Sequence, residues 1–94
     1  MTDPAKTLED AADLLLIRGR ARDQAYGPNG ELCVMAAISE AARVWTPIQD
    51  PAWIALKEVV AEPVIWNAET DDDFEVIDTL RHLAKDLRNA AVPA

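Results

Sequence analysis

The sequence has few of the residues that cross-link chains or bind metals. It contains one cysteine, one histidine and three glycines in 94 residues. A single cysteine cannot close a disulfide within the chain, which removes the usual framework of small secreted domains. One cysteine and one histidine are also too few soft ligands for a structural zinc site. We therefore expect a reducing compartment, no metal and no other cofactor.

Long apolar runs are also missing. No stretch approaches the roughly 20 apolar residues that cross a bilayer, and no N-terminal segment joins basic residues to an apolar run and a cleavage site. The sequence therefore predicts a cytoplasmic protein with no membrane contact. Its 94 residues suit a single domain, residues 1–94, with one modest core.

Basic residues are also few. Nine basic side chains stand against 17 acidic ones, a formal net charge of −8, and such a field repels a phosphate backbone. Direct nucleic-acid binding is therefore disfavoured. The charges are also segregated, because Arg18, Arg20 and Arg22 stand together while acidic residues crowd positions 69–78. Each cluster suits either a charged partner or a solvated face.

Apolar residues make up 50% of the chain but aromatic residues only 5%, and alanine supplies much of the difference, which is typical of closely packed helices. A first helix starts with Asp3 as its N-cap and Pro4 in its first turn, or with Thr7 as the cap. Its apolar stripe has a helical period and predicts an end between residues 18 and 24.

Glycine, proline and asparagine in residues 26–30 predict a turn, with a short extended pair around it. A second helix follows and stops before Pro47. Its period places one set of side chains on a buried face: Val34, Met35, Ile38, Ala41, Ala42 and Trp45.

A third helix is predicted to start at Asp50 and Pro51 and to run to about Ala61, before Pro63 closes it. Residues 64–67 are too short to classify by period, and we interpret them as a connector with Trp66 packed inward.

A long last helix is predicted after Thr70, with acidic residues at its positive N-terminal end, and Pro93 marks its limit. Amphipathic segments joined by short connections must bury their stripes against each other. The sequence thus predicts an all-α fold, a compact bundle of about four helices.

Four motifs occur in order along the chain: "LEDAADLLLIRG", "YGPNGELC" leading into a helix of small residues, "VIWN", and "TDDDFEVIDTLRHLA". Together they resemble the small proteins of actinobacteria and their bacteriophages that are classed as domain of unknown function 6197. The likeness extends over residues 8–87. It implies an actinobacterial or phage source and transfers no activity.

Cys33 is the one conventional nucleophile candidate. It lies at a helix N-terminus, where the helix dipole favours a thiolate, and His82 as base with Asn67 as orienting group would complete a nominal Cys-His-Asn set. No glycine-rich oxyanion or phosphate cradle accompanies it. Because cysteine is a common buried residue, we interpret Cys33 as mainly a packing side chain and expect no catalytic site.

Asp71, Asp72 and Asp73 are consecutive, so on a helix their carboxylates point in different directions instead of converging on a metal ion. Helix capping is the favoured interpretation. Three tryptophans exceed what a small core needs, and tryptophan is enriched at interfaces. We expect at least one in the core and another in contact with a protein partner or a second copy.

The sequence as a whole predicts a small acidic, phage-encoded interaction module that binds a host or phage protein without catalysis. Trp53 and the three aspartates are its candidate contact residues, and a homo-oligomer is a further expectation. Two alternatives stay open. One is an acidic mimic of nucleic acid that occupies a DNA-binding protein through spaced carboxylates, and the other is a cysteine-dependent enzyme using Cys33.

Overall fold

The computed structural model describes residues 3–91 of the protein. The chain forms five helices: α1 (Pro4–Arg18), α2 (Val34–Ala42), α3 (Pro51–Val59), α4 (Pro63–Glu69) and α5 (Asp73–Ala91). The predicted all-α fold is confirmed. The expected number of four helices is exceeded, because the segment interpreted as a connector is itself a helix.

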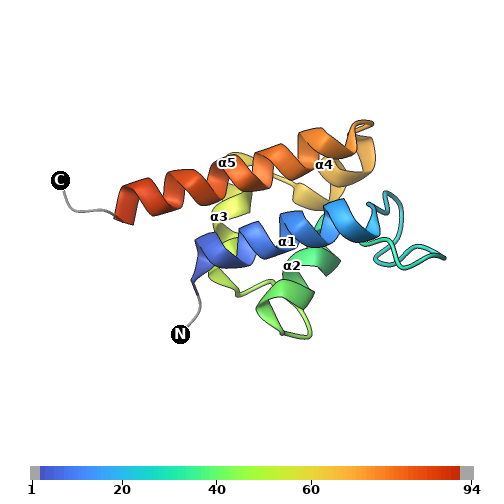
Figure 1. Ribbon diagram of the computed structural model, residues 1–94, viewed down its shortest axis with the longest axis horizontal. Helices are drawn as coiled ribbons and strands as arrows, with labels where there is room; N and C mark the ends of the chain where they lie inside the picture. Colours follow the sequence, from blue (N-terminus) through green and yellow to red (C-terminus); the bar gives the residue numbers. More distant parts are fainter. Residues whose placement is uncertain (1–2, 92–94) are drawn as a thin grey trace.

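Helix α1 lies in the middle of the molecule, with α5 along one side and α2 on the other (Figure 1). Ala11 and Ala12 of α1 are fully buried, and such small side chains let neighbouring helices approach closely. Larger side chains fill the core on either side of them: Leu8 and Leu15 from α1, Val34 and Ile38 from α2, Leu56 from α3, and Val76 and Leu80 from α5. Most of each predicted apolar stripe thus faces a common core, with Leu16, Ile17 and Trp45 as exposed exceptions.

Helices α1 and α5 run antiparallel (Figure 1). Two ion pairs border their contact, Arg81 with Asp13 at 3.2 Å and Arg88 with Glu9 at 2.6 Å. The Arg88 hydrogen bond, with a smaller contribution from its charge, holds the pKa of Glu9 below its ordinary value. The contact between the two longest helices is therefore apolar inside and ionic along its edge.

Asp3 is the N-cap of α1, as one of the two readings predicted. Its Oδ1 accepts the backbone N–H of Ala5 at 3.0 Å and of Lys6 at 3.3 Å, while Thr7 is buried within the helix. The helix ends at Arg18, inside the expected interval, because Gly19 adopts a φ of +87°, a conformation that a right-handed helix cannot continue.

The segment 19–33 folds back on itself, as the turn residues predicted. On either side of the turn, Gly27 N–H donates to Glu31 O at 2.8 Å and Cys33 N–H donates to Ala25 O at 2.9 Å. These bonds form an isolated antiparallel bridge between Tyr26 and Leu32, which confirms a short extended pair beside the turn. Leu32 is fully buried and Ala21 is 6% exposed, so this segment is held against the rest of the molecule near both of its ends.

Helix α2 ends at Ala42, three residues before Trp45. Arg43 has a φ of +60°, in the left-handed region, and the Ser39 hydroxyl donates to Trp45 O at 3.2 Å. This cap turns the chain before Pro47 is reached. Trp45 is consequently 98% exposed, and the prediction that it belongs to the buried face of this helix is wrong.

Helix α4 contradicts the prediction of a connector at residues 64–67. The sequence predicts Pro63 only as the residue that closes the preceding helix, but α3 already ends at Val59 and Pro63 is the first residue of α4. Proline suits that position because its missing donor costs nothing in the first turn. Trp66 is half-buried and packs against the core, so its inward orientation is confirmed.

Helix α5 starts at Asp73, with Asp72 as the capping residue. The Asp72 Oδ1 accepts the N–H of Phe74 at 2.9 Å, which confirms capping for one of the three aspartates. Thr70 instead closes α4, because its Oγ1 donates to Trp66 O at 2.6 Å. The predicted limit at Pro93 lies outside the described residues.

Candidate binding surfaces

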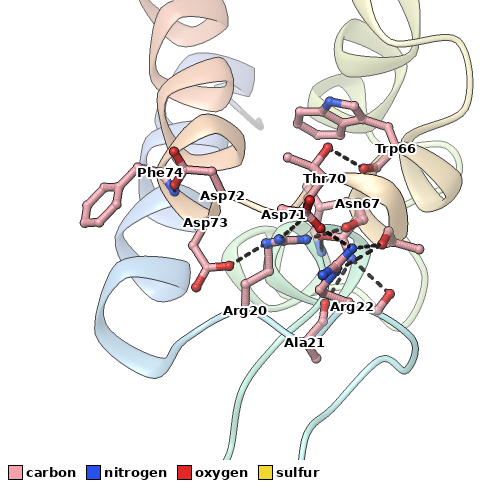
Figure 2. A network of polar contacts seen from close by, with 12 residues as sticks. Arg20, Ala21, Arg22, Trp66, Asn67, Thr70, Asp71, Asp72, Asp73 and Phe74 are labelled. Atoms are coloured by element: carbon pink, nitrogen blue, oxygen red, sulfur yellow. Dashed lines mark hydrogen bonds and ion pairs between the residues drawn. The ribbon is translucent and has the colours of Figure 1, made fainter.

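A buried arginine fixes the junction between α4 and α5. The side chain of Arg20 has no exposed surface, and its Nε contacts Asp73 Oδ1 at 3.0 Å. Its other nitrogens donate to the backbone oxygens of Asn67 and Thr70 at the end of α4 (Figure 2). Carbonyl groups at a helix C-terminus carry partial negative charge and lack intrahelical partners, so the guanidinium satisfies them. We call Arg20, Asn67, Thr70 and Asp73 the Arg20 cluster.

Arg22 makes a second, more exposed connection beside this cluster. It donates to Ala68 O from Nε at 3.0 Å and from Nη2 at 2.8 Å, and it pairs with Asp71 at 3.0 Å. Two of the three arginines of the basic segment therefore bind the acidic segment of the same chain (Figure 2). The sequence patterns treat the two charge clusters separately and do not predict that the basic segment contacts the acidic one.

The three aspartates thus have contacts within the chain. Asp71 pairs with Arg22, Asp73 pairs with Arg20, and Asp72 caps α5. Their role in partner binding stays a prediction, and it would have to coexist with these contacts.

Asn67 is 1% exposed and uses both ends of its amide. Its Oδ1 accepts the N–H of Val34 at 3.2 Å, and its Nδ2 donates to Ala21 O at 2.9 Å. The side chain therefore links α4 to the start of α2 and to the loop before it (Figure 2). An amide that is committed in this way holds backbone together and is not free to orient an imidazole.

Cys33 is the N-cap of α2, and its Sγ accepts the N–H of Ala36 at 3.3 Å. The residue is partly buried and lines a hollow of about 390 Å³ together with Asn67. His82 is exposed on α5 and is not among the lining residues. The structure brings together Cys33 and Asn67 but places the imidazole elsewhere, so the nominal Cys-His-Asn set is not assembled.

Two further site classes find no support in residues 3–91. Across that range, no three His, Cys, Asp or Glu side chains are grouped as metal ligands. None of the helices in the same range is both long and apolar enough to cross a membrane.

The three tryptophans occupy different environments. Trp53 is 5% exposed, Trp66 is half-buried and Trp45 is almost fully exposed. Trp53 confirms the expectation of a core tryptophan. As a candidate contact residue it has little free surface of its own, but it lines a surface hollow.

That hollow lies between α3 and α4 and measures about 280 Å³. Val64 and Ile65 of α4 line it and are 55% and 49% exposed. We call it the α3–α4 hollow, and its complete lining is Trp53, Lys57, Ala61, Glu62, Pro63, Val64 and Ile65. An unfilled depression beside exposed branched side chains is typical of a contact surface.

A second apolar surface surrounds the start of α2. A hollow of about 150 Å³ there is lined by Trp45, Tyr26 and Pro47, and it shares Ala25, Cys33 and Met35 with the 390 Å³ hollow. We call the surface formed by Tyr26, Cys33, Met35, Trp45 and Pro47 the α2 face. A side-chain hydrogen bond with Glu40, followed by burial, raises the pKa of Tyr26 above its ordinary value.

Comparison with known proteins assigns the chain to a family by its sequence. Neither a curated protein nor a solved structure matches it. A family match covers residues 1–93, which confirms the resemblance drawn from its motifs and extends it to nearly the whole chain. The chain belongs to the Family of unknown function (DUF6197).

Proposed function

We propose that this protein is a binding module that holds a partner protein at the α3–α4 hollow. The observation that supports the proposal is the hollow itself, an unfilled apolar depression above Trp53 with Val64 and Ile65 half-exposed at its edge. Burying one such side chain fully is worth about 1.5–3 kcal/mol. A partner that fills the depression would bury its own apolar side chain together with the half-exposed side chains of this protein, and both burials would stabilise the complex.

The size of the hollow is compatible with a single large side chain. Small-molecule sites usually enclose about 300–1,000 Å³ and bury most of the ligand, whereas this depression holds about 280 Å³. One large apolar side chain of a partner segment suits that volume.

The surrounding charge favours a basic partner segment. The two charged residues that line the hollow, Lys57 and Glu62, have opposite signs, and exposed Glu58 on α3 and Glu69 on α4 add negative charge elsewhere on the same two helices. Complementary charge steers association and disfavours wrong partners. The partner segment is therefore an apolar anchor flanked by lysine or arginine.

The Arg20 cluster supports the proposal because it holds α4 in a fixed position. It fixes the C-terminal end of α4 by two carbonyl contacts, and the Asn67 amide fixes the same helix to α2. Helix α4 has only seven residues and would be marginal alone. Fastened in this way it presents Val64 and Ile65 in one geometry, which lowers the ordering cost of binding.

The test is a selection of displayed peptides on the wild-type protein, with counter-selection on Ile65→Glu, because Ile65 lines the α3–α4 hollow whereas Val64 also lines the 390 Å³ hollow. We expect enriched peptides to carry an apolar anchor flanked by basic residues and to lose at least about tenfold in affinity for Ile65→Glu. Val59→Glu is the matched control, since Val59 is 60% exposed on α3 outside the hollow. Equal losses for both variants, or no peptide that distinguishes Ile65→Glu, would refute the proposal.

The acidic mimic remains a second candidate because of the outer face of α5. Glu75, Asp78 and Asp86 are exposed there and lie outside the ion pairs of the α1–α5 contact. A triple variant, Glu75→Gln with Asp78→Asn and Asp86→Asn, should lose competition with duplex DNA for a basic DNA-binding protein at low salt. If the wild-type protein does not compete either, this candidate is removed.

A further inference from the structure

The exposed position of Trp45 is the starting observation. The side chain is 98% exposed, and Val44 and Ile48 near it are 39% and 60% exposed. The backbone that carries it is held by hydrogen bonds, with Val44 N–H donating to Ser39 O at 3.1 Å and Asp50 N–H donating to Pro47 O at 2.8 Å. An ordered turn thus presents a large apolar side chain to water, which is unusual for an indole without a partner.

The same face also contains the depressions that such a side chain would fill. The 150 Å³ hollow is lined in part by Trp45, and the 390 Å³ hollow begins on the other side of Cys33 and Met35. In a two-fold dimer the same patch of each copy contacts the other copy. The patch must therefore carry both a projection and a hollow that receives it. The α2 face meets this requirement, with a projecting indole beside an empty apolar hollow.

Charge permits a second copy at this face, although the molecule as a whole is acidic. None of the residues that line the smaller hollow is charged. The charged residues that line the larger one, Arg22 and Asp23, have opposite signs. Helix α5, which carries the outer acids, lies on the other side of α1 from α2 (Figure 1), and salt screens charges beyond about 8 Å at physiological ionic strength. Glu40, which contacts Tyr26, and exposed Arg43 near Trp45 also have opposite signs, so a second copy of this face meets no excess of like charge.

The exposed apolar side chains of this face supply part of the area that a dimer needs. Two indoles remove about 300–500 Å² from water. Val44, Ile48, Tyr26 and Met35 of both copies would add to this, toward the 1,200–2,000 Å² that is ordinary for a specific interface.

We propose that this protein forms a two-fold symmetric dimer in which Trp45 of each copy inserts into the 150 Å³ hollow beside Cys33 and Met35 of the other. That hollow shares no lining residue with the α3–α4 hollow, so the dimer does not depend on the function proposed there.

The test is the molar mass in solution, measured by light scattering under reducing conditions from about 1 to 200 µM. We expect a mass approaching twice 10.3 kDa at the upper concentrations. Trp45→Ala should raise the dissociation constant at least about tenfold. Ile17→Ala is the matched control, because Ile17 is 80% exposed on α1 and should leave the mass unchanged. Trp45 is almost fully exposed, so its replacement should leave the helix signal in the far-ultraviolet circular dichroism spectrum unchanged.

A second readout locates the interface. Cys33 is the only thiol, and its reaction with a thiol reagent should slow several-fold as wild-type protein is concentrated, but not in Trp45→Ala. A monomeric mass at every concentration would overturn the proposal. A dimer that persists in Trp45→Ala, or a Cys33 rate independent of wild-type concentration, would overturn it as well.

Discussion

The side chain of Arg20 combines burial, charge and several partners in one residue. It is excluded from water, pairs with a carboxylate that remains half-exposed, and satisfies two carbonyls at the end of α4. Removing one member of a buried charge network leaves the other polar groups unpaired, which costs more than the pair itself contributes. The junction between the loop, α4 and α5 should therefore depend on this side chain.

We predict that Arg20→Met lowers the free energy of unfolding by about 3 kcal/mol, because methionine keeps the apolar stem but leaves the carbonyls of Asn67 and Thr70 without a donor. Urea denaturation measures the change. Arg22→Met is the matched control: its side chain is 41% exposed, and its loss should cost less than about 1 kcal/mol. Similar costs for the two variants would contradict the role assigned to Arg20.

Tyr26 is the only tyrosine, so its ionisation can be followed directly by ultraviolet absorbance. The hydrogen bond with Glu40 and burial raise its pKa above 10.0. A raised pKa favours the protonated form in the folded state, so this stabilisation is complete below the unfolded pKa and is lost as the pH rises through the folded one. Glu40→Ala should move the titration to lower pH, whereas Glu62→Ala should not. An unchanged midpoint in Glu40→Ala would exclude Glu40 as the cause.

At the scale of elements, the α1–α5 contact combines a buried stripe with ion pairs at its edge. The pairs are exposed and contribute little each. They nevertheless specify register, since Glu9 meets Arg88 and Asp13 meets Arg81. A shift by one turn would separate both pairs.

Acid should weaken this contact in a defined interval. Because Arg88 holds the pKa of Glu9 below 4.5, the Glu9 contribution is present above that value and disappears as the pH falls through the folded pKa. The urea midpoint of the wild-type protein should fall as the pH is lowered from neutral to acidic values. We expect this fall to be slightly smaller in Glu9→Gln. Glu69→Gln, on another helix, should decline like the wild type. If Glu9→Gln also follows the wild-type curve, the ion pair does not contribute.

At the scale of the whole molecule, α1 is packed on both sides, and its alanines set the distance to its neighbours. We predict that Ala11→Leu lowers the free energy of unfolding by about 1–3 kcal/mol, because the site is fully buried and has no room for extra methyl groups. Thermal or urea unfolding measures the loss. Ala90→Leu, at an exposed position of α5, should be close to neutral, and a comparable loss there would point to helix propensity instead of packing.

Much of this arrangement follows from local rules that the sequence displays. Asp3, Gly19 and the stripe of α1 define that helix, and the period of α5 identifies its buried face. Two features do not follow. Pro63 is equally compatible with closing α3 and with opening α4, and a seven-residue helix is too short for its period to decide. The end of α2 depends on Arg43 in a left-handed conformation, which glycine or asparagine usually signals and arginine does not.

The binding surfaces were harder to predict than the fold. The acidic and basic segments are visible in the sequence, but their contact depends on how α1 and α5 are placed in space. The pairing rules for helices apply only to residues three or four positions apart, so they do not predict this contact. Trp53 and Trp45 look alike in the sequence, yet one lines a hollow from the core and the other projects into water. The signal that separates them is the early end of α2, which carries Trp45 off the buried face.

Asp3 of the first helix contacts Arg88 of the last at 3.7 Å, so the beginning and the end of the helical chain are neighbours. Both lie at the opposite end of the molecule from the loop of residues 19–33 (Figure 1). Proteins with this geometry tolerate circular permutation. The same core should therefore assemble from a chain that is opened in the exposed stretch near Asp23 and closed between α5 and α1 by a short flexible linker.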